Sequence, residues 1–143
     1  MRTFDMYDNV IAALCVWREA RGEEPMVQFL VARVIVNRVR DYFKRWPNTL
    51  SGVVLQRLQF SSFNSDDPNT SKMPLLTDVS FVVCCDAVDK AFDDTTIESI
   101  TLSPFVTKMI EANHYHDDSI EPPAWAKNMK FLGKLGRILF YKA

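Results

Sequence analysis

The chain has 143 residues, which fits one ordinary domain, and 48% of them are hydrophobic, enough to build one compact core. The formal net charge of -1 and the apolar content argue against a disordered chain and against an extensive basic surface that binds nucleic acid. Three cysteines, two of them the neighbours Cys84 and Cys85, argue against a disulfide framework, so the thiols are expected as small apolar core residues.

The N-terminal region predicts two helices. Between residues 7 and 21, apolar residues recur at the spacing of three and four that buries one helical face. Asp5 or Asp8 can cap the start of this helix, and Gly22 is expected to close it in the left-handed conformation. Pro25 suits the first position of a second helix, which should run to about Tyr42 and form the central element of the core.

The middle of the chain is predicted as a short helix, a loop and a further helix. Residues 47 to 49 can start the short helix, which ends near Leu55. Residues 61 to 74 are rich in turn formers and predict a long surface loop, which in a compact domain is more often functional than idle. Asp78 can cap a helix from Val79 to Phe92, which lacks a clean polar face and is expected to be well buried.

The C-terminal region differs from the rest. Residues 101 to 112 are ambiguous, with Pro104 near a helix start. The runs "MKFLGKLG" and "RILFYK" predict a small antiparallel hairpin. The fold class is therefore predicted as mainly α (α+β), with a small C-terminal sheet, in one domain over residues 1 to 143.

The segment "REARGEE" places a candidate acid at the end of the first helix. Glu19 lies in the last turn, where unpaired carbonyls disfavour a carboxylate, and burial would raise its pKa further. A carboxylic acid kept protonated near neutral pH can act as a general acid. The alternative is an exposed Glu19 that is paired with Arg18, Arg21 or a lysine from elsewhere in the chain, and Glu23 is the second candidate in the cluster.

Two further segments carry polar groups suited to a binding cleft. In "QFSSFN", the polar residues Gln59, Ser61 and Asn64 alternate with Phe60 and Phe63, which suits a sugar groove, or else a loop that packs its Phe rings inward.

In "HYH", an extended backbone would put His114 and His116 on one face, as histidines of a cleft or as half of a metal site. The chain has no other histidine and no paired cysteine spacing, so neither a metal nor a cofactor is expected. The basic run of residues 37 to 45 is interpreted as the polar face of the second helix rather than a phosphate site.

Taken together, several blocks resemble the SleB-type cell wall hydrolases, the spore cortex-lytic enzyme family. They are "REARGEEP", "VARVIVNRV", "PNTLSGVVLQRLQFS", "DDPN", "ANHYHDD", "PPAWAK" and "GRILFYK", in that family's order, over about residues 10 to 142.

This resemblance implies a lysozyme-like domain related to lytic transglycosylases, which acts on peptidoglycan glycan strands with Glu19 as the catalytic acid. It also implies a saccharide cleft lined by Gln59, Phe60, Ser61, His114, Tyr115 and His116. The family's Gly-rich turn before "HYH" is replaced here by "SPFVTKMIEAN", and its Trp after "QFS" by Phe63, which puts glycan preference in doubt.

The reaction and its setting stay open at this point. A lytic transglycosylase needs one carboxylate, whereas hydrolysis usually recruits a second, for which Glu23, Asp66 and Asp67 are candidates. A glycan-binding module without activity is a further alternative. No signal peptide or membrane-spanning segment is visible, so we expect a protein that is made in the cytoplasm and does not insert into a membrane. We also expect a monomer. Such a protein fits a bacteriophage endolysin released through a holin, or a lytic part of a virion.

Overall fold

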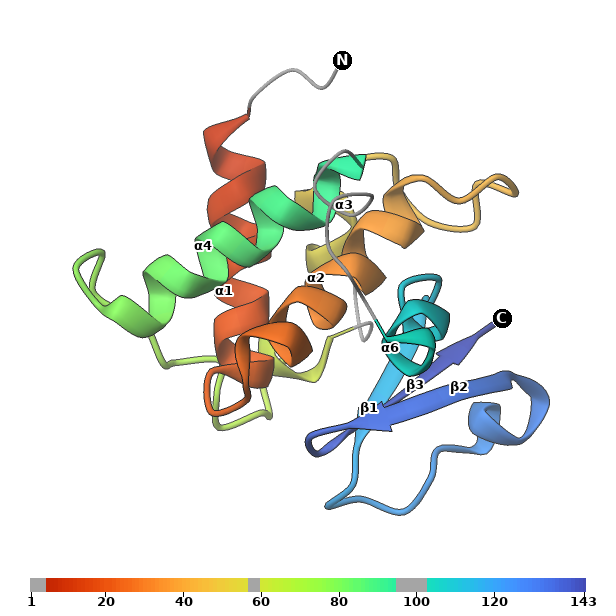
Figure 1. Cartoon of the computed structure of the whole chain (residues 1–143). Helices are drawn as coiled ribbons and strands as arrows, with labels where there is room; N and C mark the ends of the chain where they lie inside the picture. The colour runs from red at the N-terminus through yellow and green to blue at the C-terminus, as the bar shows by residue number, and fades with distance from the viewer. Residues whose placement is uncertain (1–4, 57–59, 95–102) are drawn as a thin grey trace.

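The computed structural model describes residues 5–56, 60–94 and 103–143. Helices form most of it, and a small antiparallel sheet closes the chain, which confirms the predicted fold class (Figure 1). The helices are α1 (Met6–Ala20), α2 (Pro25–Val39), α3 (Leu50–Leu55), α4 (Val79–Phe92) and α6 (Pro104–Met109), with short 3-10 turns at Ser61–Phe63 and Ala124–Asn128. None of the described helices is long and apolar enough to cross a bilayer.

Helix α1 begins as predicted and ends differently. The Asp5 carboxylate accepts a hydrogen bond from the Asp8 N–H at the start. Gly22 does not adopt the left-handed conformation, so that prediction is wrong. The last carbonyls of α1 are bonded by side chains instead: Arg21 donates to the carbonyls of Trp17 and Arg18, and Gln28 donates to that of Ala20. Because these groups are already satisfied, the helix needs no left-handed glycine at its end.

Helix α2 lies at the centre of the core, where Leu30, Val31 and Val34 are fully buried. It packs against both α1 and α4 and ends at Val39, before the predicted Tyr42. Helix α4 has the predicted bounds but is not well buried. It covers the core with one face only, and Val79 is 76% exposed on its other side.

The cysteines lie in or against the core, as predicted. Cys15 on α1 and Cys84 on α4 are buried, and Cys85 is half-buried. All three thiols are free.

The sheet has one more strand than the predicted hairpin. Strands β2 (Lys130–Leu135) and β3 (Ile138–Lys142) form that hairpin, and β1 (His114–Asp117) pairs antiparallel with β3 on its other side, in the order β1-β3-β2. Gly136 in the turn has a φ of +57°, and a Cβ there would meet the Glu23 carboxylate. The sheet lies beside α6, at the opposite side of the molecule from α4 (Figure 1).

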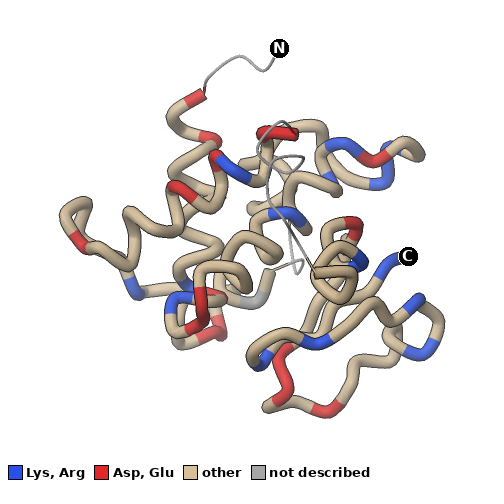
Figure 2. The backbone as a smooth tube through the Cα atoms, in the orientation of Figure 1, with Lys and Arg blue, Asp and Glu red and all other residues tan. Residues whose placement is uncertain are grey.

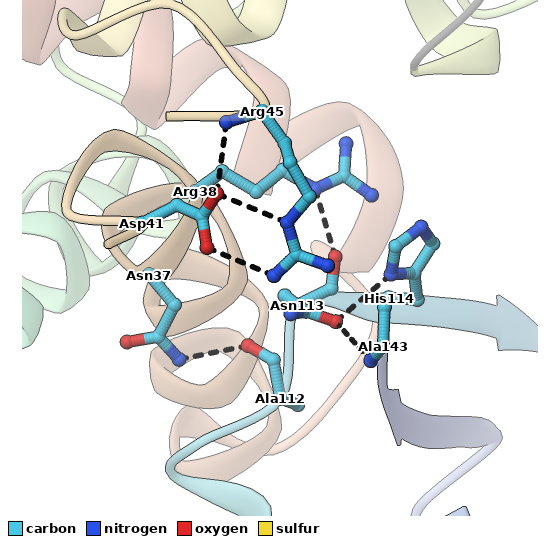
Figure 3. A network of polar contacts seen from close by, with 8 residues as sticks. All are labelled: Asn37, Arg38, Asp41, Arg45, Ala112, Asn113, His114 and Ala143. Atoms are coloured by element: carbon cyan, nitrogen blue, oxygen red, sulfur yellow. Dashed lines mark hydrogen bonds and ion pairs between the residues drawn. The ribbon is translucent and has the colours of Figure 1, made fainter. Parts of the chain in front are cut away.

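The basic run of residues 37 to 45 ties α2 to the sheet. Arg38 is only 5% exposed, so its placement on a polar helix face was wrong. Its Nε donates to the Asn113 carbonyl at 2.8 Å, and its guanidinium lies over the rings of Trp46 and Phe60. Asn37 donates to the carbonyl of Ala112 in the same network (Figure 3). Basic and acidic residues are scattered along the whole fold rather than gathered on one part (Figure 2).

Candidate active site

A cleft of about 630 Å³ separates two walls of the molecule. One wall is the C-terminal end of α1 with the loop that follows Phe60, and the other is β1 with the segment up to Trp125. The cleft is lined by Arg18, Glu19, Arg38, Phe60, Asn64, Asn69, His114, Tyr115, His116, Asp117, Ser119, Ile120, Pro123, Trp125 and Ile138.

The cleft brings most of the predicted site residues together. Glu19, Phe60, Asn64, His114, Tyr115 and His116 come from three separate segments of the sequence and line the same space. Gln59 lies outside the described residues, and the side chain of Ser61 is likewise not described. Both Phe60 and Phe63 pack into the core, as the alternative reading of their segment had it.

Glu19 sits in the last turn of α1 with its carboxyl group largely shielded from water. The Ser62 N–H lies 3.4 Å from its Oε1 and donates a hydrogen bond to it. Burial raises the pKa of Glu19, because it disfavours the charged form, and the negative charge of Asp67 acts in the same direction. Contacts with Ser62 and Tyr115 partly oppose this rise of the pKa. The carboxyl group therefore keeps its proton to higher pH than an exposed glutamate does.

The arginines on either side of Glu19 fix the loop of residues 61 to 74 instead of pairing with Glu19. Arg18 is buried and donates to the carbonyls of Ser62, Thr70 and Lys72 at 3.3, 2.7 and 3.1 Å. Arg21 donates to the Asn69 side chain at 3.3 Å. Since one helix turn carries both the candidate acid and the anchors of the loop, the loop has a fixed position relative to Glu19.

The three predicted second carboxylates lie outside the lining of the cleft. Glu23 accepts a hydrogen bond from the Arg137 N–H at the hairpin turn, and Asp67 accepts one from the Asn69 N–H. Asp66 is exposed. The carboxylate that does line the cleft beside Glu19 is Asp117, whose Oδ1 accepts from the Ser119 N–H.

Aromatic rings build the wall opposite Glu19. The Trp125 ring contacts those of His114, His116 and Tyr141 with centroid distances of 5.1, 5.9 and 5.4 Å. His116 Nε2 and the Tyr141 hydroxyl are 2.9 Å apart, and His114 Nδ1 is 2.9 Å from the Asn113 side-chain oxygen. Burial, with the charges of Arg38 and Arg45, lowers the pKa of His114 from 6.5 to about 4, so His114 is neutral at pH 7.

The described ranges of the chain contain no group of three or more His, Cys, Asp or Glu residues that could hold a metal ion. The hydrogen-bond partners of the two histidines are side chains and backbone of the protein itself.

Sequence reasoning missed several lining residues. Arg38 was not predicted as a lining residue because its basic run was interpreted as a polar helix face. Asn69 was not predicted because it lies in a loop without periodicity. Asp117 appeared only within the block "ANHYHDD", and Trp125 only within the block "PPAWAK". The signal that could have found Asp117 and Trp125 was the presence of the blocks "ANHYHDD" and "PPAWAK" in the family resemblance, since both blocks contribute to one wall of the cleft.

Comparisons with known proteins agree on the family. The model of the family described as Cell Wall Hydrolase matches residues 22–141, a range that begins just after Glu19. Two solved structures match 99% of the chain at 25% identity and a TM-score of 0.69. One is the catalytic domain of the germination-specific lytic transglycosylase SleB from Bacillus anthracis, 99% of which is covered, and the other is that of SleB from Bacillus cereus, with 94% covered.

A comparison with curated protein sequences gave no match. The family model spans most of the chain, and the structural matches extend over both walls of the cleft. The chain thus belongs to the cell wall hydrolase family and is an enzyme with the lysozyme-like, mainly helical fold of the SleB catalytic domains.

Proposed function

We propose that this enzyme is a peptidoglycan lytic transglycosylase that cleaves the β-1,4 bond between N-acetylmuramic acid and N-acetylglucosamine. The observation that carries the proposal is the position of Glu19, a shielded carboxyl group with a raised pKa that lines a cleft between a polar and an aromatic wall. The likeness to a SleB catalytic domain described as a lytic transglycosylase supports the reaction class.

The first step of the proposed reaction uses the protonated form of Glu19. Its proton moves to the bridging oxygen, and the bond between that oxygen and the muramic anomeric carbon breaks, so that the electron pair leaves with N-acetylglucosamine. The anomeric carbon then has oxocarbenium character. Because burial keeps Glu19 protonated beyond the usual pH range of a glutamate, the acid form is available for this step.

The second step uses the carboxylate that the first step leaves behind. Glu19 takes the proton of the 6-hydroxyl group of the muramic sugar, and the 6-oxygen attacks the anomeric carbon to close a 1,6-anhydro ring. The carboxyl group is thereby protonated again, and no water is consumed. One carboxylate therefore suffices for the whole cycle.

The second candidate function is hydrolysis of muramidase type, which needs another carboxylate on the cleft. Asp117 is the specific observation in its favour, because it lines the cleft and follows the His-Tyr-His strand. However, the backbone N–H of Ser119 and the guanidinium of Arg137, 2.6 and 3.8 Å away, both engage its Oδ1. An oxygen held in this way is a poor nucleophile, so we favour the reaction with one carboxylate.

The two walls suit an N-acetylated sugar. Asn64 and Asn69 present amide groups on the loop side, and Trp125 with the neutral His114 presents ring surface on the sheet side. Amides can bond hydroxyl and acetamido groups, while ring faces pack against the apolar faces of a pyranose. Release through a holin, a place in a virion and a monomeric state stay predictions that these contacts do not address.

Mass spectrometry of the released fragments tests the proposal. Purified peptidoglycan digested with the enzyme should give muropeptides with 1,6-anhydro ends, each one water lighter than the corresponding reducing end. Ends that can be reduced by borohydride would show hydrolysis instead, and Asp117→Asn should then abolish the activity. Binding to peptidoglycan without any soluble product would favour a glycan-binding module.

A further inference from the structure

Residues 41 to 46, in the connection between α2 and α3, form an aromatic corner that the proposed reaction does not use. Tyr42 is 88% exposed and Phe43 is 75% exposed, and their rings meet edge to face at a centroid distance of 5.3 Å. The corner lies beyond the end of α2 at Val39, so these rings do not serve the packing of that helix. Contiguous exposed apolar surface marks a binding site, whereas single exposed rings are common on any protein.

An ion pair inside the aromatic corner holds it in one conformation. The Asp41 carboxylate accepts from the Arg45 backbone N–H at 2.8 Å, and from Arg45 Nε and Nη2 at 3.0 and 2.8 Å (Figure 3). Lys44 has a φ of +52°, a left-handed conformation that a residue other than glycine keeps only where its surroundings enforce it. Rings that are already fixed lose little conformational freedom when a ligand binds.

The aromatic corner continues the sheet wall of the cleft. The Arg45 guanidinium lies over the rings of Phe43 and Trp46, 5.6 and 4.7 Å from their centroids. The Trp46 ring contacts that of His114 at 5.7 Å, and His114 contacts Trp125 at 5.1 Å. Both His114 and Trp125 line the cleft. A series of ring contacts therefore leads from the cleft out to Phe43.

The arginines at the aromatic corner are neutralised within the protein, which distinguishes the corner from a phosphate site. Arg45 pairs with Asp41 at 2.8 Å, and Arg40 pairs with Asp94 at 3.0 Å. Lys44 adds one positive charge, fewer than the several that a phosphate backbone engages. Ring faces of low net charge pack against the apolar faces of pyranose rings. The corner thus suits a sugar better than a polyanion.

We propose that the aromatic corner binds a further sugar of the glycan strand, outside the disaccharide whose bond is cleaved, and makes the enzyme favour long strands over short fragments. This inference rests on the proposed function, because it assigns the path of the substrate beyond the cleft. A glycan strand continues past the cleaved bond, so it has to leave the cleft over neighbouring surface. Trp46 and Phe43 supply ring surface on that path, and Asp41 is a positioning residue that acts through Arg45.

Binding of peptide-free peptidoglycan oligosaccharides to the Glu19→Gln protein tests the proposal without turnover. Isothermal titration calorimetry compares a tetrasaccharide with an octasaccharide. The octasaccharide should bind about tenfold more tightly, because it alone reaches the aromatic corner. Trp46→Ala and Phe43→Ala, each made in the Glu19→Gln protein, should remove most of this gain. The affinity for the tetrasaccharide should change little in either variant.

Further variants separate the lost sugar contact from damage to the fold. Trp46 also packs against the core, so Trp46→Phe keeps a ring there and should retain most of the gain. Asp41→Asn touches no sugar, yet it should reduce the gain for the octasaccharide alone, because it frees Arg45 and the rings beside it. Phe131→Ala is the matched control, since it removes a ring that is 54% exposed on β2, and it should leave the gain unchanged.

The proposal is overturned if the octasaccharide binds no more tightly than the tetrasaccharide, or if the gain survives both Trp46→Ala and Phe43→Ala. Loss of the gain in Phe131→Ala instead would place the strand across β2 and would overturn it as well. So would binding to anionic lipid vesicles that Phe43→Ala abolishes while the affinities for both oligosaccharides stay the same.

The binding test and the reaction class can fail separately. Equal affinity for the two oligosaccharides in an enzyme that releases anhydro ends would reject the aromatic corner and keep the proposed function. No binding of either oligosaccharide, together with no cleavage of peptidoglycan, would reject both proposals.

Discussion

The two walls of the cleft are held by different forces. On the loop side, charged hydrogen bonds from Arg18 fix three backbone carbonyls. On the sheet side, rings of Trp125, His116 and Tyr141 pack against one another. Charged hydrogen bonds are directional and fix a position closely, while ring packing tolerates small shifts. The difference indicates that the fold positions the proton donor strictly and leaves the sugar-contacting wall more adaptable.

Arg18→Met should break the loop wall and have the largest effect on stability. It removes the Arg18 donor from three carbonyl groups, of which that of Ser62 keeps the Thr70 hydroxyl as a donor, and we expect a loss of about 3 kcal/mol in the free energy of unfolding. Activity should fall as well, because the Ser62 N–H is no longer held at Glu19. Urea unfolding gives the first quantity and peptidoglycan solubilisation the second.

A control on the surface sharpens that result. Lys90→Ala breaks an exposed i,i+4 ion pair with Asp86 and should cost less than about 0.5 kcal/mol. If Arg18→Met cost no more than Lys90→Ala, the loop would not depend on the arginine.

Trp125→Ala should disturb the sheet wall with a smaller effect on stability, about 2 kcal/mol, because the ring is only half-buried. Its main consequence should be a KM several-fold higher, since a surface for the sugar is lost. Trp125→Phe keeps an aromatic ring and should recover most of the affinity. An unchanged KM in both variants would exclude a sugar contact at this position.

His114 should make the sheet wall sensitive to acid. Its pKa is lowered from 6.5 to about 4 in the folded protein, so the unfolded chain binds its proton first as the pH falls. The contribution to stability is present above pH 6.5 and is lost as the pH falls towards about 4. His114→Gln should flatten this part of the curve of unfolding free energy against pH, measured by urea titration at each pH. An equal slope in both proteins would rule out this residue as the cause.

Local patterns predicted the helices better than the walls of the cleft. The bounds of α4 were predicted from Asp78, which does occupy the N-cap position although its side chain makes no capping bond. The hairpin was predicted from two runs around a glycine. Arg38 was misplaced because its burial depends on Trp46, Phe60 and Asn113, which come together only in the folded chain. The pairing of β1 with β3 is equally non-local.

The prediction of Glu19 as the acid combined an electrostatic argument with a family resemblance. The electrostatic argument was that a helix C-terminus disfavours a carboxylate, and the resemblance assigned a catalytic role to that position. Of the two predicted causes of its raised pKa, the structure supports burial, since the helix carbonyls there are capped by Arg21 and Gln28. Which carboxylate shares the cleft could not be predicted, because the loop and β1 meet only through tertiary packing.

The most direct test of the account is the clearing of purified peptidoglycan by Glu19→Gln, measured beside its unfolding curve. The variant keeps the shape and removes the proton, so activity should fall by about 100-fold or more. The raised pKa of wild-type Glu19 means that its favourable contribution to stability is present below its ordinary value of 4.5 and is lost as the pH rises through the folded value. Glu19→Gln should therefore be at least as stable as the wild type at neutral pH. A folded variant that clears cell walls at the wild-type rate would contradict the account.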